Sequence, residues 1–494
     1  MDRIISSHKA VFALMLLLTF VVFGNTFLNG WTYDDIPVIV ENTDVHSLSG
    51  FWEDSYKGRP LRELSYLLDY QLFGDNPAGY HLQQNLWHAA NACLLFALMC
   101  ALGVAPLYAL LGTLLFLAHP IQVESVTSLG HRKELLPLFF CFVAVWAYIK
   151  SFASSGRQRW LCWLLCLGCY PLILMGNQTA GLLPLVLPLY EYLFVEREKR
   201  LLLRYPGLFA VALALAVGLA GYYYARTFDF QLALTSMYAQ NGAPGVQAYY
   251  PLLLVALKLP LLYLGQILWP VALAPEYVVG FSSEYLQWGS IAGAALLLLL
   301  LFGFVRVRKT LPALSFGLGW AFILYLPVSN FLPMHAYAMA DRYIYMVLPG
   351  VALIVAALLQ KVDLKAVNLC MGALLLALAT MTVVQNGHWR DEPSLWAQAV
   401  KVNPDSKNAH WSAAMTYIEN YEAKKAQQHL TQVLEMDRFY VMAYLELAKL
   451  QEQEGDLVAA YKNYDFFVRY GQYQFPQKAM KIKNYLAFRR SEGR

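Results

Sequence analysis

Long apolar runs alternate with short polar segments over most of the chain. A helix needs about twenty apolar residues to cross a bilayer. Runs of this kind lie near 10–29, 82–101, 104–119, 134–150, 160–176, 179–195, 206–225, 287–305, 311–328, 342–360 and 366–385. The pattern predicts an all-α polytopic membrane protein of about eleven spanning helices. We interpret a further apolar run, 250–272, as part of an outer segment, 226–285, that is re-entrant or interfacial, or else a paired hairpin.

Basic residues between the apolar runs predict the orientation of the helices. Cytoplasmic loops of membrane proteins carry an excess of Lys and Arg. Short basic clusters at 197–204 and 306–309 fall on the same side as the N-terminus. We therefore expect a cytoplasmic N-terminus and an external C-terminus. The long loops would then lie on the outer face, where we expect the function to reside: 30–80, 120–133, 226–285 and 329–341.

Composition and motifs exclude several classes of function. Of the 494 residues, 58% are hydrophobic and 14% charged, against about 25% charged residues in soluble domains. The net charge of +4 and the absence of a long basic block argue against nucleic acid as a partner. No Walker, GxGxxG or HExxH motif occurs where it could work. The energy for a reaction outside the membrane would therefore arrive on a lipid.

The sequence becomes water-soluble after Gln385 and contains an internal repeat. The segments 409–442 and 443–476 align at a period of about 34 residues, typical of tetratricopeptide repeats. The aligned pairs are Ala409 with Ala443, Ala414 with Ala448, Ala426 with Ala460, and Val433 with Phe467. We therefore predict a membrane domain over 1–386 and a short external repeat domain over 387–494. The repeat domain could bind a peptide or serve as a structural cap.

Adjacent carboxylates, Asp34 and Asp35, follow the first apolar run. Charged groups next to lipid are costly unless they serve a site. One could remove a proton from an acceptor hydroxyl, and the other could orient it or bind a divalent cation. The alternative is a solvated loop start that caps a short element.

Four basic residues in the outer loops are candidates for phosphate binding: Arg59, Arg132, Lys133 and Arg342. An arginine can hold a phosphate through two hydrogen bonds. Simple anchoring at the membrane surface is the alternative. Arg342 could also form a structural pair with its neighbour Asp341.

Other polar residues could support the site or the acceptor: His81, Glu124, Glu134, His335 and Asp341. His81, Asn85 and His88 share one helical face, and such a stripe in a spanning helix should face the bundle interior. Hydrogen bonds that only serve packing would explain the stripe equally well. Residues 60–73 are expected to form an amphipathic interfacial helix with Leu61, Leu64, Leu68 and Leu72 on one face.

Several motifs in a fixed order resemble one known family. They are YDDIPVIVEN at 33–42, RPL at 59–61, LLDYQLFG at 67–74, GYHL at 79–82, HPIQVESV at 119–126, GHRKEL at 130–135, LPVSNFLP at 326–333 and DRYIY at 341–345. Together with the repeats they resemble the transmembrane and tetratricopeptide-repeat O-mannosyltransferases and their bacterial relatives. These are polyprenol-phosphate-sugar glycosyltransferases of the GT-C class. This chain departs from them at His131, where relatives usually read Gly-Arg, and at Glu134, where Asp is common.

The resemblance implies an inverting glycosyltransferase with a polyprenyl-phosphate sugar donor, undecaprenyl-like or dolichyl-like, and a protein or glycan acceptor that the repeats could hold. It places the general base at Asp34 or Asp35, with Asp35 preferred, and phosphate binding at Arg59, Arg132 and Arg342. The segment from Trp269 to Tyr277 would close over the lipid or acceptor. No cofactor is required, although a divalent cation at the acidic pair is possible. A bacterial inner membrane with the repeats in the periplasm is expected.

Two other classes of function compete with this interpretation. A lipid or glycan transporter would place its charged residues near the membrane midplane, in inverted repeats. A non-catalytic scaffold would use the repeats alone. Substitution of the acidic pair distinguishes both from an enzyme, since only an enzyme would lose a chemical step.

Overall fold

The described part of the computed structural model is built from helices. It covers residues 8–53, 56, 58–177, 181–207, 250–279, 287–331 and 337–491, with positions 210, 214, 218 and 221. No β-strand occurs within these ranges, in agreement with the predicted all-α class. Contacts between Cα atoms divide the chain after Asp391 into a larger first unit and a second unit that begins at Glu392.

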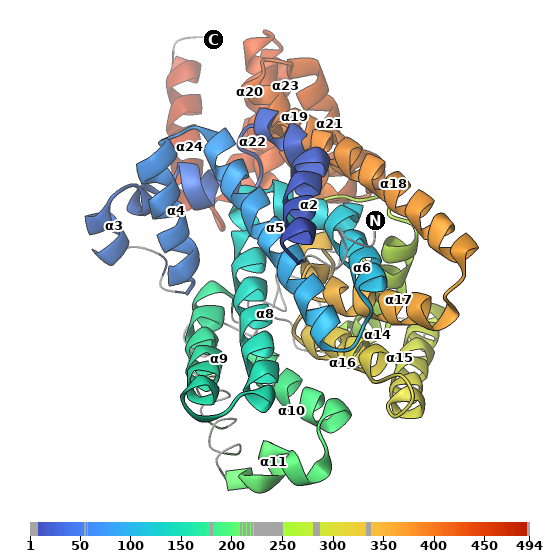
Figure 1. Ribbon diagram of the computed structural model, residues 1–494. Helices are drawn as coiled ribbons and strands as arrows, with labels where there is room; N and C mark the ends of the chain where they lie inside the picture. Colours follow the sequence, from blue (N-terminus) through green and yellow to red (C-terminus); the bar gives the residue numbers. More distant parts are fainter. Residues whose placement is uncertain are drawn as a thin grey trace. The chain divides into compact units, whose positions relative to one another are not determined.

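The first unit contains the apolar helices (Figure 1). Their bounds are α2 His8–Phe23, α3 Leu48–Glu53, α4 Pro60–Phe73, α5 Pro77–Ala101, α6 Pro106–Ala118, α7 Val123–Thr127, α8 Arg132–Ala153, α9 Gly156–Gly176, α10 Leu183–Phe194, α11 Leu201–Arg204, α14 Tyr250–Leu268, α15 Trp288–Val307, α16 Pro312–Tyr325, α17 Leu348–Val362 and α18 Lys365–His388. Helix α8 packs along α5 and α9, and α16 packs along α17. At that crossing Gly317 and Gly350 let the two backbones meet, since a Cβ on either would lie within 2.7 Å of the other's carbonyl oxygen.

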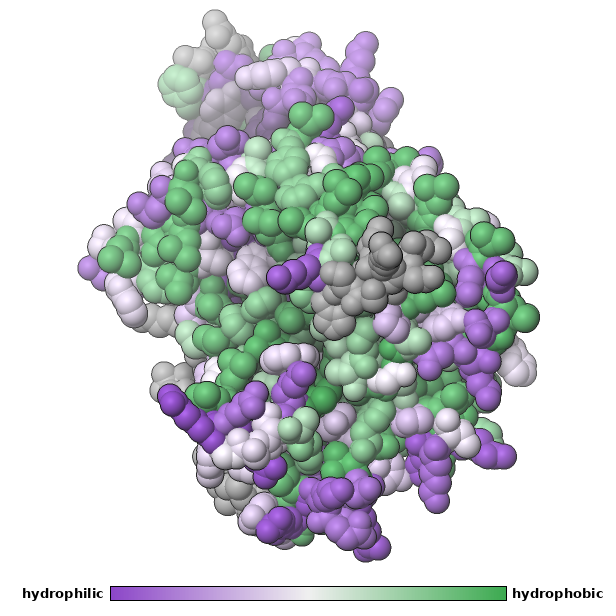
Figure 2. Space-filling view, viewed as in Figure 1, coloured by the Kyte–Doolittle hydropathy of each residue, from purple (hydrophilic) through white to green (hydrophobic). Residues whose placement is uncertain are grey.

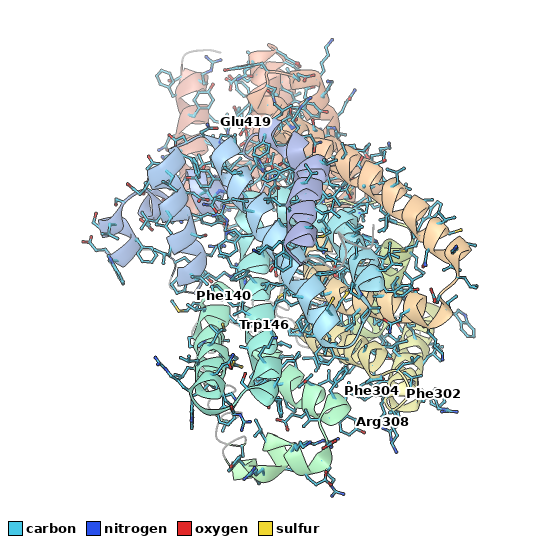
Figure 3. All side chains as sticks on the ribbon, viewed as in Figure 1. Phe140, Trp146, Phe302, Phe304, Arg308 and Glu419 are labelled. Carbon is cyan, nitrogen blue, oxygen red and sulfur yellow. The ribbon has the colours of Figure 1, made fainter. Side chains whose placement is uncertain are left out.

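Six helical stretches in the described ranges are long and apolar enough to cross a membrane: Lys9–Leu28, Leu129–Ala153, Gly156–Gly176, Tyr250–Leu268, Trp288–Val307 and Lys365–His388. A bent pair, Pro106–Ala118 with Pro120–Thr127, would make seven. The chain is thus a membrane protein, and the count of about eleven spans stays a prediction. Helix α14 is long enough to span on its own, which the sequence analysis did not expect, and residues 222–249 lie outside the described ranges. In Figure 3, Phe302 and Phe304 lie near the C-terminal end of α15, close to Arg308.

Two amphipathic features of the first unit match the sequence pattern. The polar stripe of α5, which includes His81, Asn85 and His88, is buried. His88 contacts the hydroxyl of Tyr345 at 2.9 Å and Asn85 donates to Thr26 at 3.2 Å. These packing bonds are the simpler of the two explanations for the stripe.

Helix α4 has the predicted bounds and carries an exposed row of leucines. Leu64, Leu68 and Leu72 are exposed, while the opposite face, with Arg62 and Tyr66, is buried. Apolar side chains gather over α3 and α4 on the surface in Figure 2. This division of faces is the one expected of an interfacial helix.

The second unit consists of helical hairpins. Its helices are α19 Glu392–Val402, α20 Lys407–Glu419, α21 Ala423–Met436, α22 Val441–Gln453, α23 Leu457–Gly471 and α24 Pro476–Ser491. Helices α20 and α21 recur as α22 and α23 at the spacing that the sequence alignment predicts. The four aligned pairs are fully buried, from Ala409 with Ala443 to Val433 with Phe467. Small residues therefore form the contacts within each hairpin, and the tetratricopeptide assignment stays a prediction.

Candidate active site

The acidic pair lies in a strained loop between α2 and the short helix η2 (Ile36–Val40). Tyr33, which precedes the pair, has a φ of 53°, a left-handed conformation that bulky residues rarely adopt. Such strain persists only where the surrounding structure holds it, and it is common at functional sites. Because of this turn the two carboxylates enter different environments.

Asp35 is fully buried and its carboxylate is saturated with hydrogen bonds. Its Oδ1 accepts from the backbone N–H of Gly130 at 2.7 Å and from the hydroxyl of Ser128 at 3.0 Å. Its Oδ2 accepts from the backbone N–H of Thr32 at 3.2 Å. Burial raises the pKa of Asp35 to about 7, although these hydrogen bonds act in the opposite direction. The Asp35 carboxylate holds the loop against residues 128–130.

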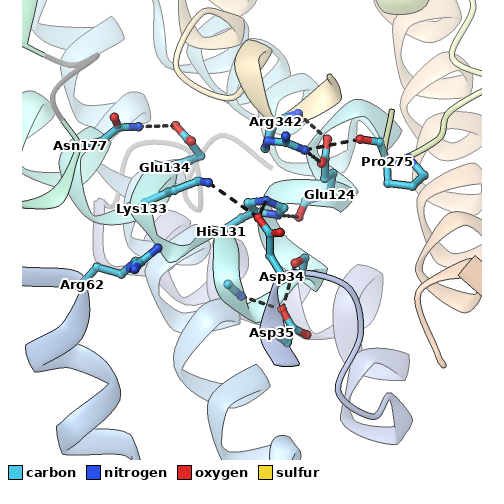
Figure 4. Close-up of polar contacts among 12 residues, drawn as sticks. Asp34, Asp35, Arg62, Glu124, His131, Lys133, Glu134, Asn177, Pro275 and Arg342 are labelled. Atoms are coloured by element: carbon cyan, nitrogen blue, oxygen red, sulfur yellow. Dashed lines mark hydrogen bonds and ion pairs between the residues drawn. The ribbon is translucent and has the colours of Figure 1, made fainter. Parts of the chain in front are cut away.

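Asp34 keeps about a third of its side chain exposed, 35%, and faces a polar pocket. Its Oδ2 lies 3.1 Å from Nε2 of His131 and 4.0 Å from Nζ of Lys133 (Figure 4). Burial favours the neutral acid, but the hydrogen bond to His131 and the charges of Lys133 and Arg342 outweigh it. They hold the pKa of Asp34 well below its ordinary value, so the carboxylate is ionised at neutral pH.

The polar pocket has a volume of about 230 Å³ and gathers both kinds of charge. Its lining residues are Tyr33, Asp34, Arg59, Lys133, Glu134, Asn177, Tyr337, Arg342 and Tyr343. Five of these were expected from the sequence: Asp34, Arg59, Lys133, Glu134 and Arg342. They come from segments far apart in the chain, so the fold brings together most of the predicted charged residues.

Arg342 is held in place by Glu124. Its backbone N–H donates to Oε2 of Glu124 at 2.8 Å, and its guanidinium forms an ion pair with Oε1. The guanidinium also donates to the carbonyl oxygen of Pro275 at 3.4 Å (Figure 4). Arg342 belongs to the short helix η9 (Asp341–Ile344). Its partner is therefore Glu124, and Asp341 accepts instead from the hydroxyl of Tyr277 at 2.8 Å.

Arg59 enters the pocket from the residue before α4. Among the described residues, no hydrogen-bond partner reaches its buried Nε atom. Burial, and then the charge of Arg62, lower the pKa of Arg59. Arg62 itself points elsewhere, because its Nε donates to Glu63 at 2.9 Å. A buried guanidinium group with a vacant donor is suited to an anionic ligand.

Arg132, expected to bind phosphate, lies apart from the pocket lining. Its Nη1 lies 2.5 Å from Oδ2 of Asp69, and both side chains are buried. Its Nε donates to Gln84 at 3.0 Å, and its guanidinium lies 4.9 Å from the ring centre of Tyr66. Arg132 therefore joins α4 and α5 to the start of α8.

Two other expected residues also lie apart from the pocket. His81 is buried on α5 and is not part of the pocket lining. His335 lies outside the described residues. Glu134, by contrast, lines the pocket and accepts from Nδ2 of Asn177 at 3.0 Å.

The expectation of a cation at the acidic pair finds little geometric support. Asp35 uses both oxygens for hydrogen bonds with the loop. Within the described ranges, no group of three His, Cys, Asp or Glu side chains is arranged to hold a metal ion. Lys133, Arg59 and Arg342 place positive charge where a cation would otherwise act.

Five residues at the site were missed by the sequence analysis: Tyr33, His131, Asn177, Tyr337 and Tyr343. His131 could have been found, because it stood out as a departure from the family pattern. The tyrosines and Asn177 carry no comparable signal in a single sequence.

Known proteins of one family are similar to this chain over most of its length. Protein O-mannosyl-transferase TMTC3 of mouse is 23% identical over 478 residues, covering 86% of this chain and 51% of the relative. Protein O-mannosyl-transferase Tmtc3 of Drosophila melanogaster is 27% identical over 477 residues, covering 78% and 50%. The chain is related to the TMTC family of protein O-mannosyl-transferases. It spans about half the length of these two relatives.

The relationship extends to other TMTC proteins. Mouse TMTC4, also named a protein O-mannosyl-transferase, is 24% identical over 484 residues, covering 83% of this chain and 65% of the relative. No family model matches the chain, and no solved structure matches it. The matched region of the mouse and fly TMTC relatives includes most of the membrane unit that carries the polar pocket.

Proposed function

We propose that this chain is an integral membrane glycosyltransferase. It moves a sugar from a polyprenyl-phosphate carrier to a hydroxyl group of a protein acceptor. The observation that carries the proposal is the polar pocket, in which one partly exposed carboxylate, Asp34, faces Arg59, Lys133 and Arg342. Mannose is the first sugar to test, because the TMTC relatives are named O-mannosyl-transferases.

In this mechanism Asp34 is the general base. Its carboxylate takes the proton of the acceptor hydroxyl while the acceptor oxygen bonds to the anomeric carbon. The anomeric carbon–oxygen bond to phosphate breaks, and polyprenyl phosphate leaves with the electron pair. Attack from the face opposite the leaving group inverts the anomeric configuration.

The structure changes our choice between the two aspartates. Asp35 was preferred from the sequence, yet its two oxygens accept three hydrogen bonds from the loop and it lies outside the pocket lining. A base must come within hydrogen-bond distance of the proton that it removes. Asp34 meets this condition, since it lines the pocket.

The three cationic side chains would bind the phosphate and stabilise the charge on the leaving group. Lys133 also lies 4.0 Å from the base, which keeps Asp34 ionised. Arg342 is held in place by Glu124 and so needs little reorganisation on binding. A monophosphate leaving group can be neutralised by these residues without a divalent cation.

An apolar pocket next to the polar one suits the lipid chain of the donor. It has a volume of about 460 Å³ and lies among α14, α15, α16 and α17. Ile344 and Val347 line it, while Arg342 and Tyr343 of the same stretch line the polar pocket. Phe304, labelled in Figure 3, lines its α15 side. A ligand with a charged phosphate and a long apolar chain would use both pockets at once.

The remaining parts of the proposal concern location and acceptor. The distribution of basic loops supports a site on the extracytoplasmic face, with the second unit outside. The resemblance to bacterial members of the family favours a bacterial inner membrane as its setting. The tetratricopeptide-like hairpins of the second unit would hold the protein acceptor. The segment from Trp269 to Tyr277 contacts η9 through Pro275 and Tyr277, which supports a role in enclosing the donor.

The decisive experiment uses the full chain in proteoliposomes with polyprenyl-phosphate [³H]mannose. Two activities are measured: transfer of mannose to extracts of extracytoplasmic proteins, and hydrolysis of the donor to free mannose. The hydrolysis readout needs no known acceptor. We expect D34N to lose both activities while keeping its thermal stability. If the wild type consumes no donor, the enzyme proposal fails and a transporter or scaffold is favoured. If D34N consumes donor at the wild-type rate, Asp34 is not the base.

A further inference from the structure

The ring of His131 is held on both sides in the wall of the polar pocket. His131 ends the short helix η5 (Leu129–His131) and is fully buried. Its Nε2 lies 3.1 Å from Oδ2 of Asp34, and its Nδ1 lies 3.3 Å from the carbonyl oxygen of Glu124 (Figure 4). The ring therefore connects the base to the residue that anchors Arg342.

The contact with Asp34 indicates which ring nitrogen carries the proton. Asp34 is ionised at neutral pH, and a carboxylate oxygen can only accept. A neutral ring with its proton on Nε2 donates to Oδ2 of Asp34 at 3.1 Å. The contact of Nδ1 with the carbonyl oxygen of Glu124 is longer, at 3.3 Å, and is the weaker of the two.

We propose that His131 is the positioning residue of the base, through the hydrogen bond from its Nε2. The inference rests on the proposed glycosyltransferase function. His131 fixes Oδ2 of Asp34, so that Oδ1 is left to take the proton of the acceptor hydroxyl. The same hydrogen bond favours the ionised form of Asp34. A substitution at this position thus changes both the geometry and the basicity of the site.

The surroundings of the pair define its electrostatic setting. The charged and titratable groups that face it come from five segments: Lys133 of α8, Glu124 of α7, Arg342 of η9, and the separate stretches that contain Tyr33 and Tyr337. Lys133 and Arg342 favour the ionised carboxylate, while Glu124 is neutralised by Arg342. The hydrogen bond from His131 acts in the same direction as the charges of Lys133 and Arg342.

Two substitutions test this hydrogen bond. In H131L the ring contacts are lost, and we expect kcat to fall by about a hundredfold, within the usual range for a general base. The acid limb of the pH–rate profile should also move to higher pH, because Asp34 loses a hydrogen bond that favours its ionised form. In H131Q the side-chain amide can still donate to Asp34, so we expect H131Q to keep part of the lost rate and to show a smaller shift. The KM for the donor should change little in either variant.

A matched control is available on α5. His88 is equally buried and contacts the hydroxyl of Tyr345 and the carbonyl of Leu117, away from the polar pocket. H88Q should keep the wild-type pH–rate profile. A wild-type rate in H131L, or a rate in H131Q no higher than that of H131L, would overturn the proposal.

A second measurement does not depend on transfer activity. Solid-state NMR of ¹⁵N-histidine-labelled protein in lipid vesicles reports the protonation of each ring nitrogen, and the H131Q spectrum assigns the His131 signals. The Nε2 signal should move in D34N, because the carboxylate that accepts its proton is lost. An unchanged signal overturns the proposal. If the signal moves but the wild type transfers no sugar, the hydrogen bond between His131 and Asp34 stands and the glycosyltransferase proposal falls.

Discussion

The guanidinium of Arg132 lies 2.5 Å from the carboxylate of Asp69, and this buried ion pair ties the interfacial helix α4 to the start of α8. The next residue, Lys133, lines the polar pocket. Adjacent basic residues thus serve different purposes: one supports the wall of the pocket and the other supplies charge within it. This relationship separates substitutions that affect stability from those that affect chemistry.

Removal of Arg132 should destabilise the protein. R132Q leaves Asp69 buried without its partner, which costs about 3–5 kcal/mol for a buried pair. Thermal unfolding in detergent or nanodiscs should show a large decrease in Tm. The double variant R132Q/D69N should recover part of this loss. A single variant with the wild-type Tm would contradict the role of Arg132 as a structural residue.

The two aspartates should respond differently to the same substitution. D34N should lower the transfer rate by at least about a hundredfold, as expected for loss of a general base, and keep its Tm. D35N should lower the Tm. Its amide nitrogen would face the N–H and hydroxyl donors of the loop, and the loss of a buried hydrogen bond costs about 1–3 kcal/mol. The measurements are donor consumption and thermal unfolding. Reversed behaviour of the two variants would restore Asp35 as the base.

Arg59 should contribute to donor binding. R59Q removes a charged donor whose Nε has no partner among the described residues. A hydrogen bond to a charged group contributes about 1.5–3 kcal/mol, so the KM for the lipid donor should rise accordingly. Transfer by the wild type should persist in EDTA, since Arg59, Lys133 and Arg342 supply the positive charge. R306Q, at the far end of α15, is the control. Loss of transfer in EDTA would show that a divalent cation is needed.

The second unit should lose stability in mild acid. Nε2 of His410 donates to the carbonyl of Pro404, so its Nδ1 accepts from Nδ1 of His429 at 2.9 Å. Burial, and then the charge of His410, lower the pKa of His429 below its ordinary value of 6.5. The unfolded state then binds more protons than the folded state, and stability falls as the pH drops below about 6.5.

Hydrogen exchange of the full chain can test this effect. Amides of α20 and α21 should exchange faster at pH 5.5 than at pH 7.5 after correction for intrinsic rates. H429Q should remove much of the pH dependence. Equal protection of α20 and α21 at both pH values in the wild type would argue against a neutral, buried His429 as the source of acid sensitivity.

Local periodicity determined much of this protein from the sequence alone. Apolar runs, the leucine row of α4 and the polar stripe of α5 were correctly predicted, because each depends on the spacing of residues along one helix. The buried alanines of the repeat, such as Ala409 and Ala443, were identified from the sequence for the same reason. The charged residues of the pocket were also largely identified, since charges beside apolar runs are conspicuous.

Only the tertiary structure decided what those charged residues do. Asp34 and Asp35 are adjacent and chemically identical, and they differ because a left-handed turn at Tyr33 sends one carboxylate to the pocket and the other to the backbone of Gly130. Arg342 meets Glu124 across more than two hundred residues of chain. The burial, the hydrogen-bond partners and the orientation of these side chains depend on contacts between segments that are distant in the chain. The spacing of residues along the sequence does not predict such contacts.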